Sequence, residues 1–278
     1  MIEWEQHAEV AFQGEPGAYS ETAVYRIFGP TARPKPKKHF SDVFRAVWTD
    51  STKYGVVPIE NSIEGSVNQV YDLFLQYDLK VCGELALRIS HCLIADPETD
   101  LEEVKVVYSH PQALGQCRNY LERLGIEMVS TYDTAGSVKM IKEQRLTTAA
   151  AIAGERAAEI YGMKILAQDI ADTRNNYTRF FVLAKNELPP TGNDKTSIIF
   201  STKHVPRALY ESLGELANRG INMTKIESRP TKQNLWEYNF YLDFDGHMNE
   251  QICAEALNGL RNRSLFVKVL GSYPRGIE

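Results

Sequence analysis

A hydroxyl and a guanidinium stand side by side at the start of one strongly apolar segment. Thr178 and Arg179 precede residues 180–184, which read Phe-Phe-Val-Leu-Ala. An arginine can bind a carboxylate, and a threonine hydroxyl can donate or accept a hydrogen bond. An alkyl hydroxyl gives up its proton poorly at neutral pH, so we expect Thr178 to hydrogen-bond a reacting group and to relay a proton at most.

Strand geometry separates these two side chains. Alternate side chains of a regular strand face opposite sides, so Thr178 and Phe180 share one face and Arg179 lies on the other. Arg179 reaches the same ligand as Thr178 only if the strand starts irregularly, and otherwise it has a structural role. Asn175 and Asn176 suit an irregular turn, so both roles for Arg179 stay open.

Four other polar segments have the composition of strand-to-helix junctions. Such junctions expose backbone N–H groups and the positive end of a helix dipole to a carboxylate, and in parallel α/β folds ligands collect there. Helix capping alone explains any one of them, but four together favour a small anionic ligand. They are residues 14–20 (Gly-Glu-Pro-Gly-Ala-Tyr-Ser), 60–66 (Glu-Asn-Ser-Ile-Glu-Gly-Ser), 109–113 (Ser-His-Pro-Gln-Ala) and 133–137 (Asp-Thr-Ala-Gly-Ser).

Proton donors are available within these junctions. His110 is the junction residue that can titrate near neutral pH, although a helix-start histidine bonded to the backbone fits its position equally well. Glu60 and Glu64 are further candidates if burial keeps them protonated. The junctions contain no GxGxxG or Walker sequence, so nucleotide binding has little support.

Composition excludes several classes of protein. The 278 residues are 43% hydrophobic with a net charge of −5, which argues for folded cores and against a nucleic-acid partner. The basic run 33–38 is expected to be a solvated loop that enters a strand. The four cysteines form no CxxC pair and no zinc-ligand spacing, which fits free core thiols in a reducing cytoplasm. We expect no signal peptide, no membrane segment of about 20 apolar residues, no metal and no cofactor.

The elements that position these residues alternate between strand and helix, which predicts an α/β fold with a largely parallel sheet. Residues 81–95 could be a strand crossing between two lobes, and 149–153 fits either a strand or a helix. The expected strands are 10–12, 54–59, 104–108, 127–131, 164–167 and 178–184, and the expected helices are 20–28, 67–75, 112–124 and 135–143.

A segment rich in charge, proline and glycine separates a second domain. We predict a first domain at 1–185, a linker at 186–194 and a second domain at 195–278. The latter reads βαββαβ, the ferredoxin-like pattern. Its expected strands are 196–202, 221–228, 236–244 and 265–270, and its expected helices are 206–218 and 251–261.

In their order, these motifs resemble those of prephenate dehydratases. Residues 12–20 resemble the family's first motif in a variant form, and 55–62 with Gly65, 109–113 and 178–180 resemble the next three. Residues 227–230 (Glu-Ser-Arg-Pro) resemble the phenylalanine-binding motif of the ACT domain. The resemblance spans about residues 10–273. It implies a two-lobed catalytic domain like type II periplasmic binding proteins, followed by a ferredoxin-like ACT domain. Because the strand pattern begins by Val10, we expect a monofunctional member without a chorismate mutase domain.

The resemblance implies an activity and a set of site residues. The reaction is the decarboxylative dehydration of prephenate to phenylpyruvate, CO2 and water in L-phenylalanine biosynthesis, without a cofactor. The implied catalytic residues are Thr178, His110 and Glu60. The implied substrate-binding residues are Tyr19, Ser20, Asn61, Ser62, Ser109, Gln112, Thr134, Arg179 and Phe180. The implied phenylalanine-binding residues are Ala208, Leu209, Asn222, Glu227, Ser228, Arg229 and Pro230.

The reaction constrains where charge belongs. A cation on the departing carboxylate would stabilise the ground state, so the strongest anion contacts should hold the pyruvyl carboxylate. The ring carboxylate should occupy a drier, less charged place. The leaving hydroxyl needs a proton donor, which is typically worth roughly 10²–10⁴-fold.

One departure and several alternatives remain. The family's ACT helix usually opens with Pro-Gly-Ala-Leu, but Arg207 stands at the glycine position, which leaves the strength of phenylalanine binding open. Arogenate is an alternative substrate, and a non-catalytic amino-acid-sensing protein is an alternative function. The resemblance implies a homodimer or homotetramer. Because the linker follows the strand of Thr178, an effector could bias lobe closure.

Overall fold

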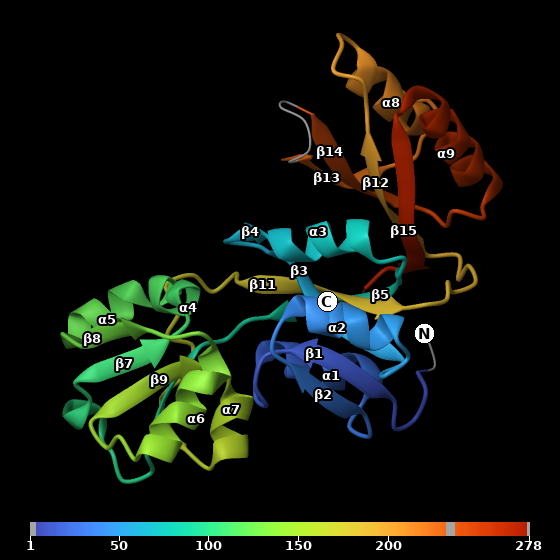
Figure 1. The fold of residues 1–278 in the computed structure, drawn as a ribbon. Helices are drawn as coiled ribbons and strands as arrows, with labels where there is room; N and C mark the ends of the chain where they lie inside the picture. The colour runs from blue at the N-terminus through green and yellow to red at the C-terminus, as the bar shows by residue number, and fades with distance from the viewer. Residues whose placement is uncertain (1–3, 232–236, 277–278) are drawn as a thin grey trace. The chain divides into compact units, whose positions relative to one another are not determined.

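The computed structural model describes residues 4–231 and 237–276 (Figure 1). The chain forms two compact units. One contains Trp4–Tyr77 and Leu85–Phe181, and the other contains Asp78–Glu84 and the described residues between 182 and 276. Strands β5 (Lys80–Arg88) and β11 (Tyr177–Ala184) contribute residues to both units. Every helix among the described residues is too short or too polar to cross a lipid bilayer.

The first lobe is built on a mixed sheet with the strand order β2-β1-β3-β11-β5, to which β4 adds beside β3. Strand β1 is parallel to β2 and β3, and β4 is antiparallel to β3. The middle of β1, residues 10–12, is completely buried. The remaining elements of this lobe are β1 (Glu9–Gln13), α1 (Tyr19–Phe28), β2 (Arg33–Lys37), α2 (Phe40–Trp48), β3 (Tyr54–Asn61), β4 (Gly65–Ser66) and α3 (Asn68–Gln76).

The second lobe is built on a sheet with the order β10-β6-β9-β7-β8. Strand β7 is parallel to β8 and β9, whereas β6 is antiparallel to β9 and β10. Its elements are β6 (Cys92–Ala95), the 3₁₀ helix η1 (Leu101–Glu103), β7 (Val106–Ser109), α4 (Pro111–Gln116), α5 (Arg118–Leu124), β8 (Glu127–Ser130), α6 (Thr134–Gln144), β9 (Ala149–Ala153), α7 (Glu155–Tyr161) and β10 (Lys164–Ala167).

Two segments cross between the lobes, residues 89–91 and residues 168–176. They are hydrogen-bonded to each other, because Ile89 N donates to Asn176 O at 2.8 Å and Ile170 N donates to His91 O at 3.0 Å. The expected single strand over 81–95 is therefore interrupted where it passes from lobe to lobe.

Several expectations about the lobes are wrong. Both sheets are mixed, not largely parallel, because β4 is antiparallel to β3 in the first and β6 is antiparallel to β9 and β10 in the second. The basic run expected to be a loop forms β2 at the end of its sheet, a place where proline is tolerated because no donor is needed on the open side. The expected helix over 112–124 divides at Cys117, and α2 and α7 are additional to the expected helices.

The C-terminal sheet has the order β13-β14-β12-β15 with every neighbouring pair antiparallel, which confirms the βαββαβ pattern. Helices α8 and α9 pack on it through a core that includes Phe200, Leu242 and Leu257. Trp236, expected to open β14, lies outside the described residues. The elements are β12 (Asp194–Ser201), α8 (Ala208–Ala217), β13 (Met223–Pro230), β14 (Tyr238–Asp245), α9 (Gln251–Arg263) and β15 (Phe266–Pro274).

The end of the expected linker is structured. The Asp194 carboxylate accepts hydrogen bonds from the backbone N–H groups of Thr191 and Gly192 and from the Thr191 hydroxyl, at 2.7–3.0 Å. Asp194 itself is the first residue of β12. The domain limits at 185/186 and 194/195 stay predictions.

Candidate functional site

A cleft of about 510 Å³ lies between the two lobes of the first unit and takes its lining from both. Residues from all four predicted junctions and from β11 meet there. Eight of the predicted catalytic and substrate-binding residues line it: Tyr19, Ser20, Asn61, His110, Gln112, Thr134, Thr178 and Phe180.

Helix starts dominate this cleft. Helices α1, α3 and α6 begin with residues that line it, so the positive ends of three helix dipoles converge on one space. The residues that precede α1 and α3, Ala18 and Val67, have side chains that cannot cap a helix, so ligand oxygens can accept from the first turns. The shorter helix α4 adds His110, whose Nδ1 accepts from Gln112 N at 3.3 Å. Both alternatives for His110 thus stay open.

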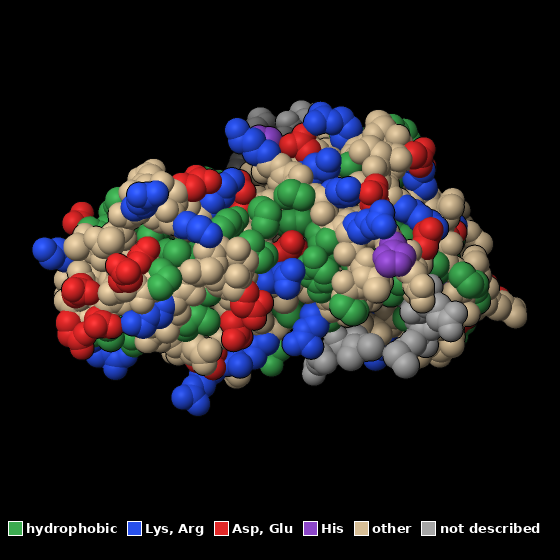
Figure 2. Space-filling model, turned by 90° about the horizontal axis from the view of Figure 1, so that it is seen from below, with side chains coloured by type: hydrophobic (Ala, Val, Ile, Leu, Met, Phe, Trp, Pro, Cys, Tyr) green, Lys and Arg blue, Asp and Glu red, His purple; other side chains and the backbone are tan. Residues whose placement is uncertain are grey.

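The charges in the cleft are unusual for an anion site. Its described lining includes the carboxyl groups of Glu64 and Asp133, but no lysine or arginine. Burial raises the pKa of Asp133, although hydrogen bonds to backbone N–H groups, first Gly136, partly oppose this. On the molecular face in Figure 2, Lys/Arg and Asp/Glu side chains are interspersed. The described lining of the cleft thus offers an anion helix dipoles and neutral polar groups, not a cationic side chain.

The hydrogen bonds of Asn61 fix the orientation of the Thr178 hydroxyl. Asn61 Oδ1 accepts from the backbone N–H groups of Ile63 and Glu64 at 2.9 and 3.0 Å. A backbone N–H can only donate, so the other end of the Asn61 amide must be its amino group. That group donates to Thr178 Oγ1 at 3.0 Å. Thr178 thus accepts from Asn61, and its own proton is available to a ligand.

The same chain of hydrogen bonds continues through residues that sequence reasoning did not assign to the site. The Asn61 amino group also donates to Asn176 Oδ1 at 2.7 Å, and Asn176 Nδ2 donates to Gln116 Oε1 at 2.9 Å. Gln116 Oε1 lies 2.8 Å from His91 Nε2, and His91 Nδ1 lies 2.8 Å from the Tyr19 hydroxyl.

The sequence contained a signal for two of these residues, Asn176 and His91. Asn176 is fully buried, although its position before the strand of Thr178 indicated a turn. His91 is a polar residue inside the apolar segment 81–95, and such a residue calls for a partner when buried.

Four predicted site residues do not line the cleft. Thr178 and Phe180 line the cleft and Arg179 does not, as expected from the alternation of side chains along a strand. Its guanidinium lies over the Phe181 ring at 4.8 Å and 3.8 Å from the carboxylate of Glu60. Ser62 Oγ accepts from Tyr177 N and donates to Asn175 O, both at 3.0 Å.

The fourth residue, Ser109, is fully buried and donates to Ile152 O at 2.7 Å. Glu60, Ser62, Ser109 and Arg179 are therefore outside the cleft lining and contact neighbouring parts of the lobes.

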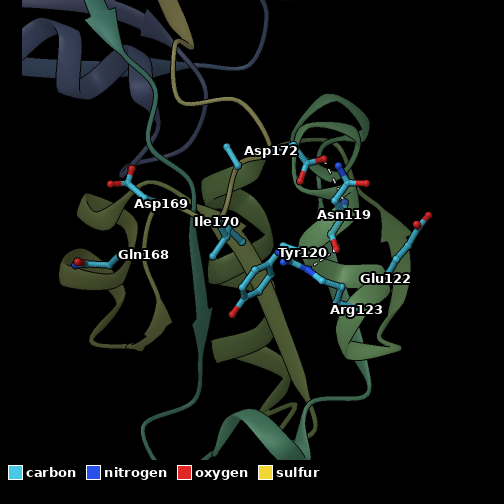
Figure 3. Close-up of a pocket in the computed structure, with 9 residues that line it drawn as sticks. Asn119, Tyr120, Glu122, Arg123, Gln168, Asp169, Ile170 and Asp172 are labelled. Atoms are coloured by element: carbon cyan, nitrogen blue, oxygen red, sulfur yellow. Dashed lines mark hydrogen bonds between the residues drawn. The ribbon is translucent and has the colours of Figure 1, made fainter.

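A second pocket, of about 660 Å³, lies in the second lobe beside the crossing segment 168–172 (Figure 3). Asp172 Oδ2 accepts from Asn119 N at 3.2 Å, and Asp169 accepts from Ser90 and Arg88. These contacts tie α5 and the two crossings together. The described residues contain no group of three His, Cys, Asp or Glu side chains able to hold a metal ion.

The predicted phenylalanine-binding residues of the C-terminal domain do not all meet within one chain. Ala208 and Leu209 begin α8, whereas Asn222 follows the other end of this 10-residue helix, which spans about 15 Å. Asn222 donates to Asp245 Oδ2 at 2.9 Å. Residues 227–230 lie on β13, an outer strand of the sheet, where Glu227 is 3.4 Å from Lys225.

These features define a class of protein. Two mixed sheets with helices, joined by two crossings and separated by a cleft lined with helix starts, form a two-lobed α/β domain. The antiparallel βαββαβ sheet that follows it is an ACT-like domain.

Comparison with known proteins identifies the family. Residues 10–188 match the family described as prephenate dehydratase, and the chain belongs to this family. It is 42% identical to a bifunctional chorismate mutase/prephenate dehydratase of Aquifex aeolicus, in an alignment that covers 98% of this chain and 75% of that protein. It is also 42% identical to arogenate dehydratase/prephenate dehydratase 2 of Arabidopsis thaliana, in an alignment that covers 95% of this chain and 72% of that protein. The solved prephenate dehydratase of Arthrobacter aurescens in complex with L-Phe superposes with a TM-score of 0.88 at 32% identity, over 96% of this chain and 90% of that one.

Proposed function

We propose that this chain catalyses the decarboxylative dehydration of prephenate to phenylpyruvate, CO2 and water, with Thr178 as the hydrogen-bond donor to the leaving hydroxyl. The observation that carries this proposal is the direction of the bond between Asn61 and Thr178, which leaves the threonine proton to the cleft.

The charges of the cleft fit this chemistry. The converging helix starts hold the substrate carboxylates through backbone N–H groups and dipoles. A cation clamped on the ring carboxylate would oppose its loss as CO2, and the described lining contains no lysine or arginine. Aromatisation supplies the driving force, and a hydrogen bond to the departing hydroxyl lowers the barrier to its loss. His110, which lines the same cleft, is the candidate source of the proton.

Steady-state kinetics test this role. Prephenate turnover is followed as phenylpyruvate enolate in base. Thr178→Ala should lower kcat by roughly 10²–10⁴-fold, the contribution of a positioned proton donor. The matched control is Thr178→Ser, which keeps the hydroxyl and should retain most activity. An unchanged kcat in Thr178→Ala would remove Thr178 from the mechanism.

Arogenate is a second candidate substrate, favoured by one observation. Arogenate carries an ammonium group where prephenate has a keto group, and the carboxyl groups of Glu64 and Asp133 line the cleft. The Arabidopsis relative is named for both activities. Parallel assays measure kcat/KM for each substrate, and the larger value identifies the preferred one. If the Asp133 carboxylate binds the ammonium group, Asp133→Asn should lower kcat/KM for arogenate more than for prephenate.

We further propose that L-phenylalanine regulates the enzyme through the ACT-like domain of a homodimer or homotetramer. The Arthrobacter relative was solved with L-Phe, and the separation of Ala208 from Asn222 fits a site completed by a second copy. Light scattering and inhibition by L-Phe test this proposal. Binding of L-Phe without turnover of either substrate would favour an amino-acid sensor instead.

A further inference from the structure

His91 occupies the point where the first crossing segment passes between the lobes. Its side chain is 2% exposed and lines the cleft. Its backbone carbonyl accepts from Ile170 N of the other crossing at 3.0 Å. Its ring joins Tyr19, from the first lobe, to Gln116, from the second. One residue of the cleft thus connects both lobes and both crossings.

The donor of each hydrogen bond along this chain follows from the backbone contacts of Asn61. Because the Asn61 amino group donates to Asn176 Oδ1, the Asn176 amino group faces Gln116 and donates to its Oε1. Gln116 Oε1 is therefore an acceptor, so His91 Nε2, at 2.8 Å from it, must carry a proton. In a neutral imidazole the other nitrogen is then an acceptor.

The Tyr19 hydroxyl lies between two acceptors for its single proton. Ser90 O is at 2.7 Å and His91 Nδ1 is at 2.8 Å, so Tyr19 shares its proton between the carbonyl and the ring. Burial lowers the pKa of His91, and the hydrogen bond to Gln116 only partly opposes this, so the ring is neutral at pH 7. With Oε1 held by Asn176 and His91, Gln116 Nε2 is directed toward Glu64, 3.4 Å away on the cleft lining.

We propose that His91 is a positioning residue for the dehydratase reaction. Its Nε2–H holds the Gln116 amide in the one orientation that keeps the hydrogen-bond chain to Thr178 intact and presents the Gln116 amino group to the substrate. Without this donor, the Gln116 amide is held by Asn176 at 2.9 Å and by the longer contact of its Nε2 with Glu64 at 3.4 Å. The catalytic part of this inference rests on the proposed function, whereas the tautomer of His91 does not.

Two variants test the roles of the two ring nitrogens of His91 separately. The amide of His91→Gln can replace Nε2–H and donate to Gln116 Oε1, whereas the shorter His91→Asn reaches only toward Tyr19. We expect kcat to fall by no more than about tenfold in His91→Gln, the loss of one hydrogen bond, and by about 10²-fold in His91→Asn, the cost of a misplaced catalytic group. KM should change less than kcat in both. The exposed His204→Gln is the matched control and should leave kcat unchanged.

A measurement on the unmodified protein complements these variants. Long-range ¹H–¹⁵N NMR on ¹⁵N-histidine-labelled enzyme at pH 7 should show a neutral His91 with the proton on Nε2, assigned by subtraction with variants at the other histidines. A proton on Nδ1, or a kcat of His91→Asn equal to or above that of His91→Gln, would overturn the proposal. If the unmodified enzyme turns over neither prephenate nor arogenate, the proposed function fails, and the NMR result still decides the hydrogen-bond assignment.

Discussion

The cleft and the C-terminal domain both contain polar motifs, but side chains of these motifs are bonded to one another in the cleft, whereas those of the C-terminal domain lie along an outer strand. In the cleft, Asn61, Asn176 and Thr178 are partners of one another across more than 100 residues of sequence. In the C-terminal domain, residues 227–230 lie on the outer strand β13, along which partly buried and exposed side chains alternate. The cleft is organised before a ligand arrives, which favours catalysis. An outer strand remains open to whatever pairs with it or packs on it, which suits regulation.

The most damaging single change to the organisation of the cleft is Asn61→Asp. A carboxylate can still accept from Ile63 N and Glu64 N but cannot donate to Thr178 or Asn176. The Thr178 hydroxyl would then donate to the introduced carboxylate, and its proton would no longer be available to the substrate. We expect kcat to fall by about 10²–10³-fold, the cost of removing one oriented donor. Steady-state kinetics provide the measurement, with circular dichroism to verify the fold.

Asn61→Ser is the control for charge. A serine hydroxyl introduces no negative charge, so kcat should fall less than in Asn61→Asp. Equal losses in both variants would contradict the assignment of the Asn61 amide.

Burial of His91 predicts a pH dependence of stability. The pKa of His91 is lowered in the folded state, so the unfolded chain binds the proton first. The free energy of unfolding should fall as pH drops through about 6.5 and stop falling below the folded pKa, with a slope of at most about 1.4 kcal/mol per pH unit from this group. Urea unfolding between pH 7 and 5 measures it. His91→Gln should lack this component, and an identical slope in both proteins would refute it.

The C-terminal domain offers a test of its own at Arg207. This residue precedes α8 with φ +72°, a left-handed conformation that favours glycine. Arg207→Gly should raise the free energy of unfolding by about 1 kcal/mol, reduced by the exposed ion pair with Glu211. It should also tighten L-Phe binding in calorimetry, because a bulky side chain is removed.

Arg207→Ala separates these two effects. It removes the guanidinium but keeps a Cβ in the left-handed conformation, so it should not gain the same stability. Equal stabilisation by alanine and glycine would show that backbone strain at this position is not the cause.

The smallest expected effect concerns closure of the lobes. Lys139 on α6 lies 3.1 Å from Glu15, which belongs to the loop before α1, so this ion pair joins the two lobes. Because both groups are partly exposed, Lys139→Met should raise KM only about two- to fivefold, and less at high salt. Lys142→Met on the same helix is the control. A larger change in kcat than in KM would point away from closure.

Much of this architecture is predictable because its signals are local. The βαββαβ domain, β1, β3 and α6 follow from hydrophobic periodicity and turn residues, each visible within a short window of sequence. The order of the polar junctions also indicates the family and eight of the residues that line the cleft. Even so, β2 reads as a loop, because pairing with β1 and not the propensity of its prolines and lysines makes it a strand.

The amino-acid sequence alone establishes which residue types are available to the reaction: a threonine at a strand start, amides at helix starts and a histidine that can titrate. Folding in three dimensions sets which way each group faces. It placed Arg179 beside Glu60 and outside the cleft lining, and it joined His91, Gln116 and Asn176 into one chain with Thr178. The physical reason is that a hydrogen bond between residues 25 to 117 positions apart leaves no periodic trace in the sequence, whereas its direction depends on every partner along the chain.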